Sequence, residues 1–178
     1  MSTQEVSGVS GHLTVEAVYD SGEREVLVDR KNHIVVGFLR TVSRLITQKP
    51  TEVSATEFAI NSLWVEASDS ALVEGVTSND EGPEGVVVHR YIFDRDSDVD
   101  TEVDGVEGLV EFRGELPAES GNDETIRAVG LYSQGDDAND PSTSDNVHLV
   151  ARQLVGSIPK THEFSLEFTW RIQIQLDD

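Results

Sequence analysis

Four aspartates at alternate positions have the residue type and spacing best suited to chemistry in this chain. They are Asp94, Asp96, Asp98 and Asp100. Alternating carboxylates can wrap a hard cation such as Ca²⁺, which takes about six to eight oxygen ligands. The EF-hand pattern fails, because its sixth and twelfth positions require Gly and Glu but are Val99 and Gly105 here. The stretch therefore predicts either a loop that binds Ca²⁺ or another cation through these aspartates, or a solvated acidic loop. No other cofactor is expected.

The other reactive residue types do not form a recognisable catalytic pattern. The five histidines are scattered without the HExxH spacing of a zinc protease, at His12, His33, His89, His148 and His162. The chain contains no GxSxG elbow, no P-loop and no GxGxxG fingerprint. Cysteine is absent, which excludes disulfides, thiol nucleophiles and thiolate metal sites. We therefore expect no catalytic residues and a protein that is not an enzyme.

The element with the clearest pattern lies near the C-terminus, at 163–175. Polar residues there alternate with six apolar ones, namely Phe164, Leu166, Phe168, Trp170, Ile172 and Ile174. Successive side chains of a β-strand point to opposite faces, so the alternation places all six apolar groups on one side. Such a strand is stable only beside other strands and against an apolar surface.

Further strand patterns occur at 12–29 (a hairpin), 56–66, 86–94, 106–116, 124–133 and 147–155. The stretches 67–84, 94–105 and 134–146 read as polar or acidic loops. Apolar residues at helical spacing predict one amphipathic helix at about 33–48, which we expect to cover a sheet. The predicted fold is mainly β: an antiparallel, jelly-roll-like β-sandwich of about eight or nine strands. We expect residues 1–10 to be a flexible arm and residues 11–178 to be a single domain.

The charge balance indicates a folded protein in concentrated salt. The chain has 34 acidic and 13 basic residues, a net charge of −21. At about 1 M salt the Debye length is roughly 3 Å, so a charge of this size is screened. In dilute buffer the same charges repel and oppose compaction. A merely acidic protein of ordinary salt is the alternative. Nucleic-acid binding is disfavoured because Lys and Arg do not cluster. No signal peptide or apolar span is present, so we expect synthesis in a cytoplasm and no membrane partner.

Several short motifs follow one another in a recognisable order. They lie at 31–34 (KNHI), 126–132 (IRAVGLY), 149–152 (LVAR), 158–161 (IPKT) and 166–172 (LEFTWRI). This series resembles the tail-fibre, baseplate and virion-surface proteins of tailed viruses. It departs from their pattern at Ala128, where Glu is usual, and in the insertion 134–146. Together with the acidic composition, the resemblance implies a virus of a halophilic archaeon.

The resemblance implies a structural protein located in the virion, in a tail, a baseplate, a capsid decoration or a turret. Its expected partners are further copies of itself and other virion proteins, and contact with the host surface stays open. Within the motifs we expect Gly130 to allow a close approach, Arg152 to pair with an acid of an adjacent strand or subunit, and Trp170 to be a core or interface aromatic. Two alternatives stay open: a cellular β-sandwich module that recognises carbohydrate or a protein, and an enzyme on a jelly-roll or cupin-like scaffold.

Overall fold

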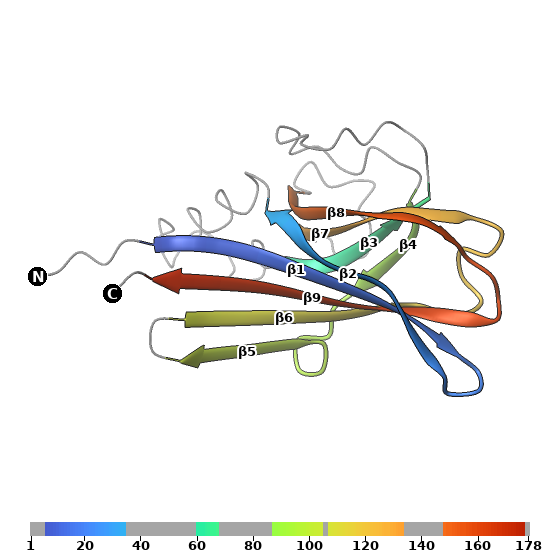
Figure 1. Ribbon diagram of the computed structural model, residues 1–178, viewed down its shortest axis with the longest axis horizontal. Helices are drawn as coiled ribbons and strands as arrows, with labels where there is room; N and C mark the ends of the chain where they lie inside the picture. The colour runs from blue at the N-terminus through green and yellow to red at the C-terminus, as the bar shows by residue number, and fades with distance from the viewer. Residues whose placement is uncertain (1–5, 35–59, 68–86, 105–106, 134–147, 177–178) are drawn as a thin grey trace, which may run out of the picture.

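The computed structural model describes residues 6–34, 60–67, 87–104, 107–133 and 148–176. This part of the chain consists of antiparallel strands and turns, with no helix (Figure 1). The strands are β1 (Val6–Tyr19), β2 (Arg24–Ile34), β3 (Ile60–Glu66), β4 (Val87–Ile92), β5 (Val99–Asp104), β6 (Glu107–Leu116), β7 (Thr125–Ser133), β8 (His148–Pro159) and β9 (Phe164–Leu176). The prediction of a mainly β protein is therefore confirmed.

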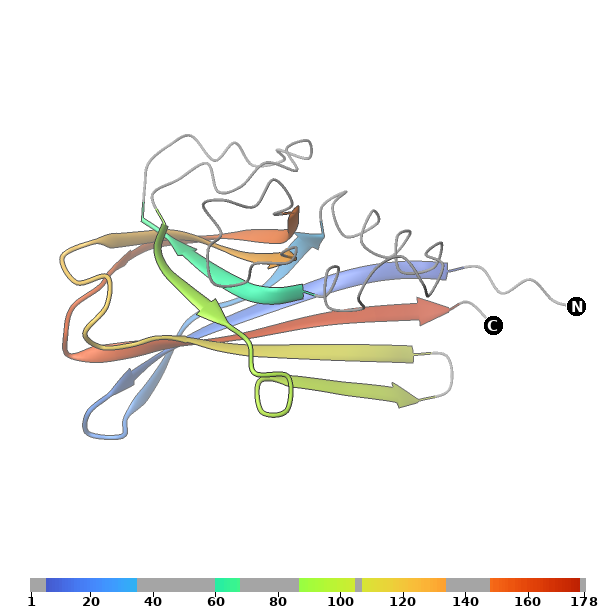
Figure 2. The same ribbon diagram turned by 180° about the vertical axis from the view of Figure 1, so that it is seen from behind.

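The strands form two sheets that share one strand. Their order is β4-β3-β7-β8-β2-β1-β9-β6-β5. Along most of its length β2 pairs with β1, and only its last two residues, His33 and Ile34, pair with β8. We call β2-β1-β9-β6-β5 the five-stranded sheet and β4-β3-β7-β8 the four-stranded sheet. Figure 2 shows the two sheets from behind, with β5 at the outer edge of the first.

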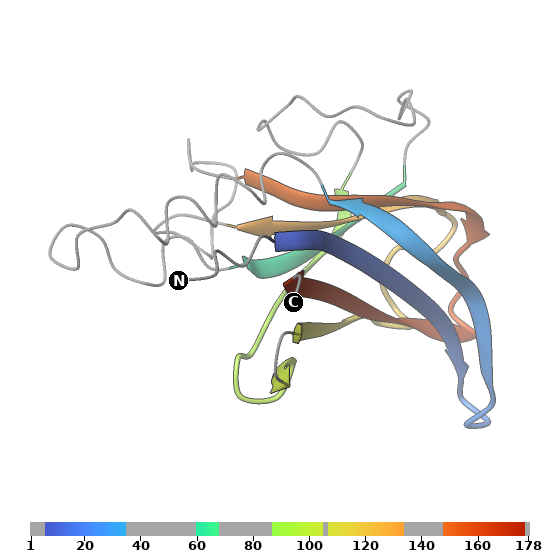
Figure 3. The same ribbon diagram turned by 60° about the vertical axis from the view of Figure 1, so that its left-hand side comes forward.

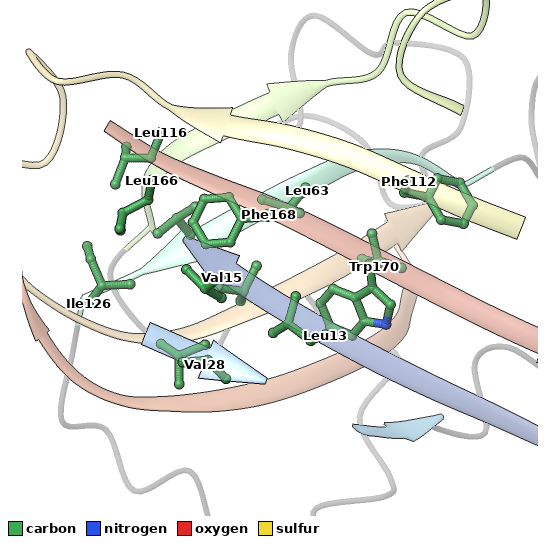
Figure 4. Packing of buried hydrophobic residues seen from close by; sticks show 14 of the residues in the cluster. Leu13, Val15, Val28, Leu63, Phe112, Leu116, Ile126, Leu166, Phe168 and Trp170 are labelled. Atoms are coloured by element: carbon green, nitrogen blue, oxygen red, sulfur yellow. The ribbon is translucent and has the colours of Figure 1, made fainter. Parts of the chain in front are cut away.

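The centre of the five-stranded sheet is the long pairing of β1 with β9. It runs from Val6 opposite Leu176 to Tyr19 opposite Phe164. The alternation predicted for β9 is confirmed, because Leu166, Phe168 and Trp170 are buried while the residues between them are not. Their cross-strand partners on β1 are also apolar, and side chains of both strands gather on one face in Figure 4. Burial of this face stabilises both strands together.

Residues from both sheets build one hydrophobic core. Leu63 of β3 and Phe112 of β6 belong to the same buried cluster as the apolar faces of β1 and β9. Phe93, which follows β4, lies with its ring centroid 5.3 Å from that of Phe112. Gly114 of β6 comes so close to β4 that a Cβ there would lie 3.2 Å from the ring of Tyr91. The two sheets are therefore packed against each other at this point.

The described residues bear on the predicted arm, the predicted helix and one predicted acidic loop. Residues 6–10, placed by the sequence in a flexible arm, are the start of β1, because all of them except Ser7, at a register shift, pair with residues of β9. The helix predicted at about 33–48 has its first two residues in β2, and the remainder lies outside the described residues. The acidic stretch 94–105 is not a continuous loop, because Val99–Asp104 is strand β5. No helix in the described residues has the length and apolar character needed to cross a membrane.

Candidate functional site

The first part of the acidic stretch is a turn held by its own carboxylates. Asp98 accepts hydrogen bonds from the Tyr91 hydroxyl at 3.1 Å, the Asp94 amide at 2.9 Å and the Ser97 hydroxyl at 3.1 Å. Asp94 accepts one from the Asp96 amide at 3.0 Å. Burial of the ring raises the pKa of Tyr91, and the neighbouring Asp98 carboxylate raises it further. These hydrogen bonds link β4 to β5. The carboxylates predicted to bind a cation therefore stabilise the turn between the two strands.

Asp100 is separated from the other three aspartates. It lies on β5, opposite Glu111, and forms an ion pair with Arg113 at 3.2 Å. Among the described residues, no group of three or more His, Cys, Asp or Glu side chains is arranged to hold a metal ion. Cation binding by this loop therefore stays a prediction, and the described residues contain no cluster of ligands that supports it.

The histidines with described side chains lie apart. His12 on β1 forms a hydrogen bond with Asp29 of β2, and this contact lowers the pKa of Asp29 despite an opposing effect of desolvation. His89 on β4 is half-buried, and burial lowers its pKa. His162 is exposed in the turn between β8 and β9. His33 and His148 are placed only as backbone positions, in β2 and β8.

The outer face of the four-stranded sheet carries a buried charge pair. The sequence motifs identified one of its members, Arg152, but not the other. The Glu66 side chain at the end of β3 is 1% exposed and the Arg152 side chain on β8 is 12% exposed, and the two form an ion pair. The Tyr132 hydroxyl lies 3.4 Å from the second Glu66 oxygen. Arg152 does pair with an acid, but the expectation of an adjacent strand or subunit is wrong, because Glu66 lies on β3 with β7 between the two. The only local signal for Glu66 is its position beside the apolar run of β3.

Two small residues of β7 explain how Arg152 reaches Glu66. In the strand register, Ala128 faces Glu66 and Gly130 faces Arg152. Strands separated by one intervening strand lie about 10 Å apart, so the Arg152 side chain must cross β7. A long side chain at either small position would lie in its path. The small side chain of Ala128 therefore has a packing reason.

Aromatic stacking surrounds this pair. The rings of Trp64 and Tyr132 stack with centroids 4.3 Å apart, and the Arg90 guanidinium of β4 lies 4.7 Å from the Trp64 ring. Gly130 makes the stack possible, because a Cβ there would lie 2.6 Å from the Tyr132 ring. The prediction that Gly130 allows a close approach is thus confirmed. With Leu149, Trp64 and Tyr132 form a second hydrophobic cluster, separate from the main core.

Lys160 is a second buried charge, at the junction of β8 and β9. It is 1% exposed, and its Nζ donates to the carbonyl oxygens of Ala118 at 3.0 Å and Thr161 at 2.6 Å, and to Asn122 Oδ1 at 3.4 Å. Burial lowers the pKa of the Lys160 amine. Three acceptors match the three donors of an ammonium group, so Lys160 fastens the β6–β7 turn to the β8–β9 turn.

The outer face of the five-stranded sheet carries ion pairs between neighbouring strands. Glu111 of β6 accepts from Arg171 of β9 at 2.6 Å and from Arg113 at 2.7 Å. Burial alone would raise the pKa of Glu111, but the two arginines outweigh burial and lower it. Arg24 of β2 pairs in the same way with Glu16 and Glu167. These charges hold strands side by side and leave the face polar.

Most of these contacts join one strand or turn to another. Comparison of the chain with protein-family models, curated proteins and solved structures finds no match.

Proposed function

We propose that this chain is a non-enzymatic structural subunit of a tailed-virus particle, in a tail, a baseplate, a capsid decoration or a turret. It assembles with itself and with other virion proteins in concentrated salt. The observation that carries the proposal is that the five-stranded sheet ends in two strands, β2 and β5, whose outer edges pair with no other described strand over most of their length. An open edge presents unpaired N–H and C=O groups, which are a template for pairing with another chain.

The finer architecture in this proposal is a sandwich, with the two sheets face to face around the shared core. Two contacts support it: Gly114 lies against Tyr91, and Phe93 lies near Phe112. Both join the β4 end of the four-stranded sheet to β6 of the five-stranded sheet. A rigid sandwich that displays its edges suits a subunit whose task is to hold neighbours in place. The buried groups Glu66 and Lys160 serve the same end, since each ties separate strands or turns together.

Concentrated salt is part of the proposal because of the net charge of −21. Copies with this charge repel one another in dilute buffer, and the repulsion falls as salt shortens the Debye length. We therefore expect both the fold and its association to depend on salt.

Sedimentation velocity and circular dichroism across a salt series test this proposal. We expect a folded protein that associates in multimolar salt, and loss of strand signal and of association in dilute buffer. A folded monomer at every salt concentration would contradict self-assembly. A monomer that binds a glycan in an array would favour the carbohydrate-binding module instead. Labelling of purified virus particles with an antibody against the chain then tests the location.

A further inference from the structure

We propose that copies of this chain join head to tail, with strand β5 of one copy added beside strand β2 of the next. The proposal rests on the self-assembly proposed above and names the surfaces that meet. Its result is a five-stranded sheet that continues from copy to copy.

Both strands have an open side within the described part of the chain. Residues 24–31 of β2 pair with β1 alone, because β8 joins β2 only at His33 and Ile34. Figure 3 shows β2 leaving β8 and running out towards the β1–β2 turn. At the other end of the sheet, all of Val99–Asp104 pairs with β6 on one side only. Each strand can therefore accept a neighbour by backbone hydrogen bonds.

The two edges carry opposite charge. Strand β5 has three exposed acids and no base; Asp100 pairs with Arg113 of its own sheet, and Glu102 and Asp104 remain for a partner. Strand β2 has three bases; Arg24 already pairs with Glu16 and Glu167, so Arg30 and Lys31 are the two that face a partner. Its two acids are already engaged, because Asp29 pairs with His12 and Glu25 accepts a hydrogen bond from the Tyr19 hydroxyl. In a chain of net charge −21, a strand with such an excess of bases is the complement that the acidic edge needs.

The most exposed large apolar side chains in the described residues also lie on these strands. Val103 of β5 is 82% exposed and Val26 of β2 is 57% exposed. A new strand beside each would remove part of this apolar surface from water. Charge and hydrophobicity thus favour a partner at the same two places.

The direction of the strands sets the geometry of the junction. Neighbours in the five-stranded sheet are antiparallel, so β2 and β5, at its two ends, run in the same direction. A copy added with the same face outward therefore forms a parallel β5–β2 pair. The six residues of β5 give a junction about 20 Å long at roughly 3.3 Å per residue.

Head-to-tail addition also explains why the edges differ. A two-fold β5–β5 junction would place acids opposite acids, which is destabilising. A junction between different edges leaves one free β2 and one free β5 on every growing chain, so it produces a ring if the rotation closes and a filament if it does not. Both outcomes suit a repeated component of a particle.

Charge reversal of each edge tests the inference. The first variant is Glu102→Lys with Asp104→Lys, and the second is Arg30→Glu with Lys31→Glu. All four side chains are exposed, so we expect both variants to fold. In salt where the wild type associates, we expect each variant alone to associate about tenfold more weakly, because its two edges carry the same sign. An equimolar mixture should recover association, because each edge again finds its opposite.

A matched control for the β5 variant carries the same total charge change away from the edges. Glu119→Lys with Glu163→Lys alters two exposed turn residues and should associate as the wild type does. If the wild type associates but neither edge variant is impaired, or if the β2 variant alone associates normally through a β5–β5 junction, the head-to-tail inference is overturned while self-assembly stands. If the wild type never associates, both fail.

Discussion

Replacement of Gly130 by alanine measures how tightly the outer cluster of the four-stranded sheet is packed. A Cβ at Gly130 would lie 2.6 Å from Cε2 and 3.3 Å from Cζ of Tyr132, and 3.3 Å from a methyl group of Leu149. Carbon atoms in ordinary contact are about 3.5–4.0 Å apart, so the Tyr132 ring must move by about 1 Å. The ring is stacked on Trp64, and its hydroxyl lies 3.4 Å from Glu66, so neither side offers it free space.

Overpacking of this kind costs about 1–3 kcal/mol of unfolding free energy. For a chain of this length, 1 kcal/mol corresponds to about 2–4 °C in Tm, so we expect Gly130→Ala to melt about 2–12 °C lower. The measurement is thermal unfolding followed by circular dichroism in high salt. Near-ultraviolet circular dichroism should change as well, because the Trp64–Tyr132 stack is disturbed.

Gly108→Ala is the matched control, since Gly108 also lies in a strand and a Cβ there meets nothing within 4 Å. It should leave Tm unchanged or raise it slightly. Replacement of Tyr132 by leucine removes the ring, so Gly130→Ala should cost less in that background. Equal melting temperatures for Gly130→Ala and the wild type would refute the packing argument.

Two further predictions concern buried charge and pH. Arg152→Met should lower the unfolding free energy by about 3–5 kcal/mol, because it removes an ion-pair partner of the buried Glu66 carboxylate. Glu66→Gln added to it should recover part of the loss. Denaturant unfolding measures both, and an undisturbed midpoint for Arg152→Met would contradict the pairing. Burial lowers the folded-state pKa of His89 below 6.5, and Glu115 opposes this shift more weakly. The unfolded chain therefore binds the proton more readily than the folded one. The contribution of His89 to stability is present above pH 6.5 and is lost as the pH falls through its folded-state pKa. His89→Gln should flatten the dependence of unfolding free energy on pH in that range, and an unchanged pH profile would exclude His89 as its source.

Local pattern was enough to predict most strands of this protein. Apolar residues alternate with polar ones in β9, and this pattern predicts which side of the strand is buried. The apolar residues on that side are buried in the structure, namely Phe164, Leu166, Phe168 and Trp170. Strand β5 was missed because it is an edge strand with one neighbour. Its side chains need not cover a core. Val99, Thr101 and Val103 alternate with acids, but only two of the six residues are apolar, so the acidic composition outweighed the alternation.

Contacts between distant residues were not predictable from pattern. The ion pair of Arg152 with Glu66 joins residues on strands β8 and β3, with β7 between them. Asp94 and Asp100 are six positions apart in the chain, yet the first belongs to a turn and the second to a strand with its own arginine partner. Spacing along the chain says nothing about either outcome, because strand pairing decides which side chains meet.

The sequence by itself determined that the chain is mainly β, strongly acidic and without a recognisable catalytic motif, because periodicity and charge are properties of each segment alone. The tertiary structure decided the order of the strands, the partner of each buried charge, and the acidic and basic edges at opposite ends of one sheet. Those features depend on which strands become neighbours, and neighbours are chosen by the burial of many apolar faces at once rather than by any single stretch of chain.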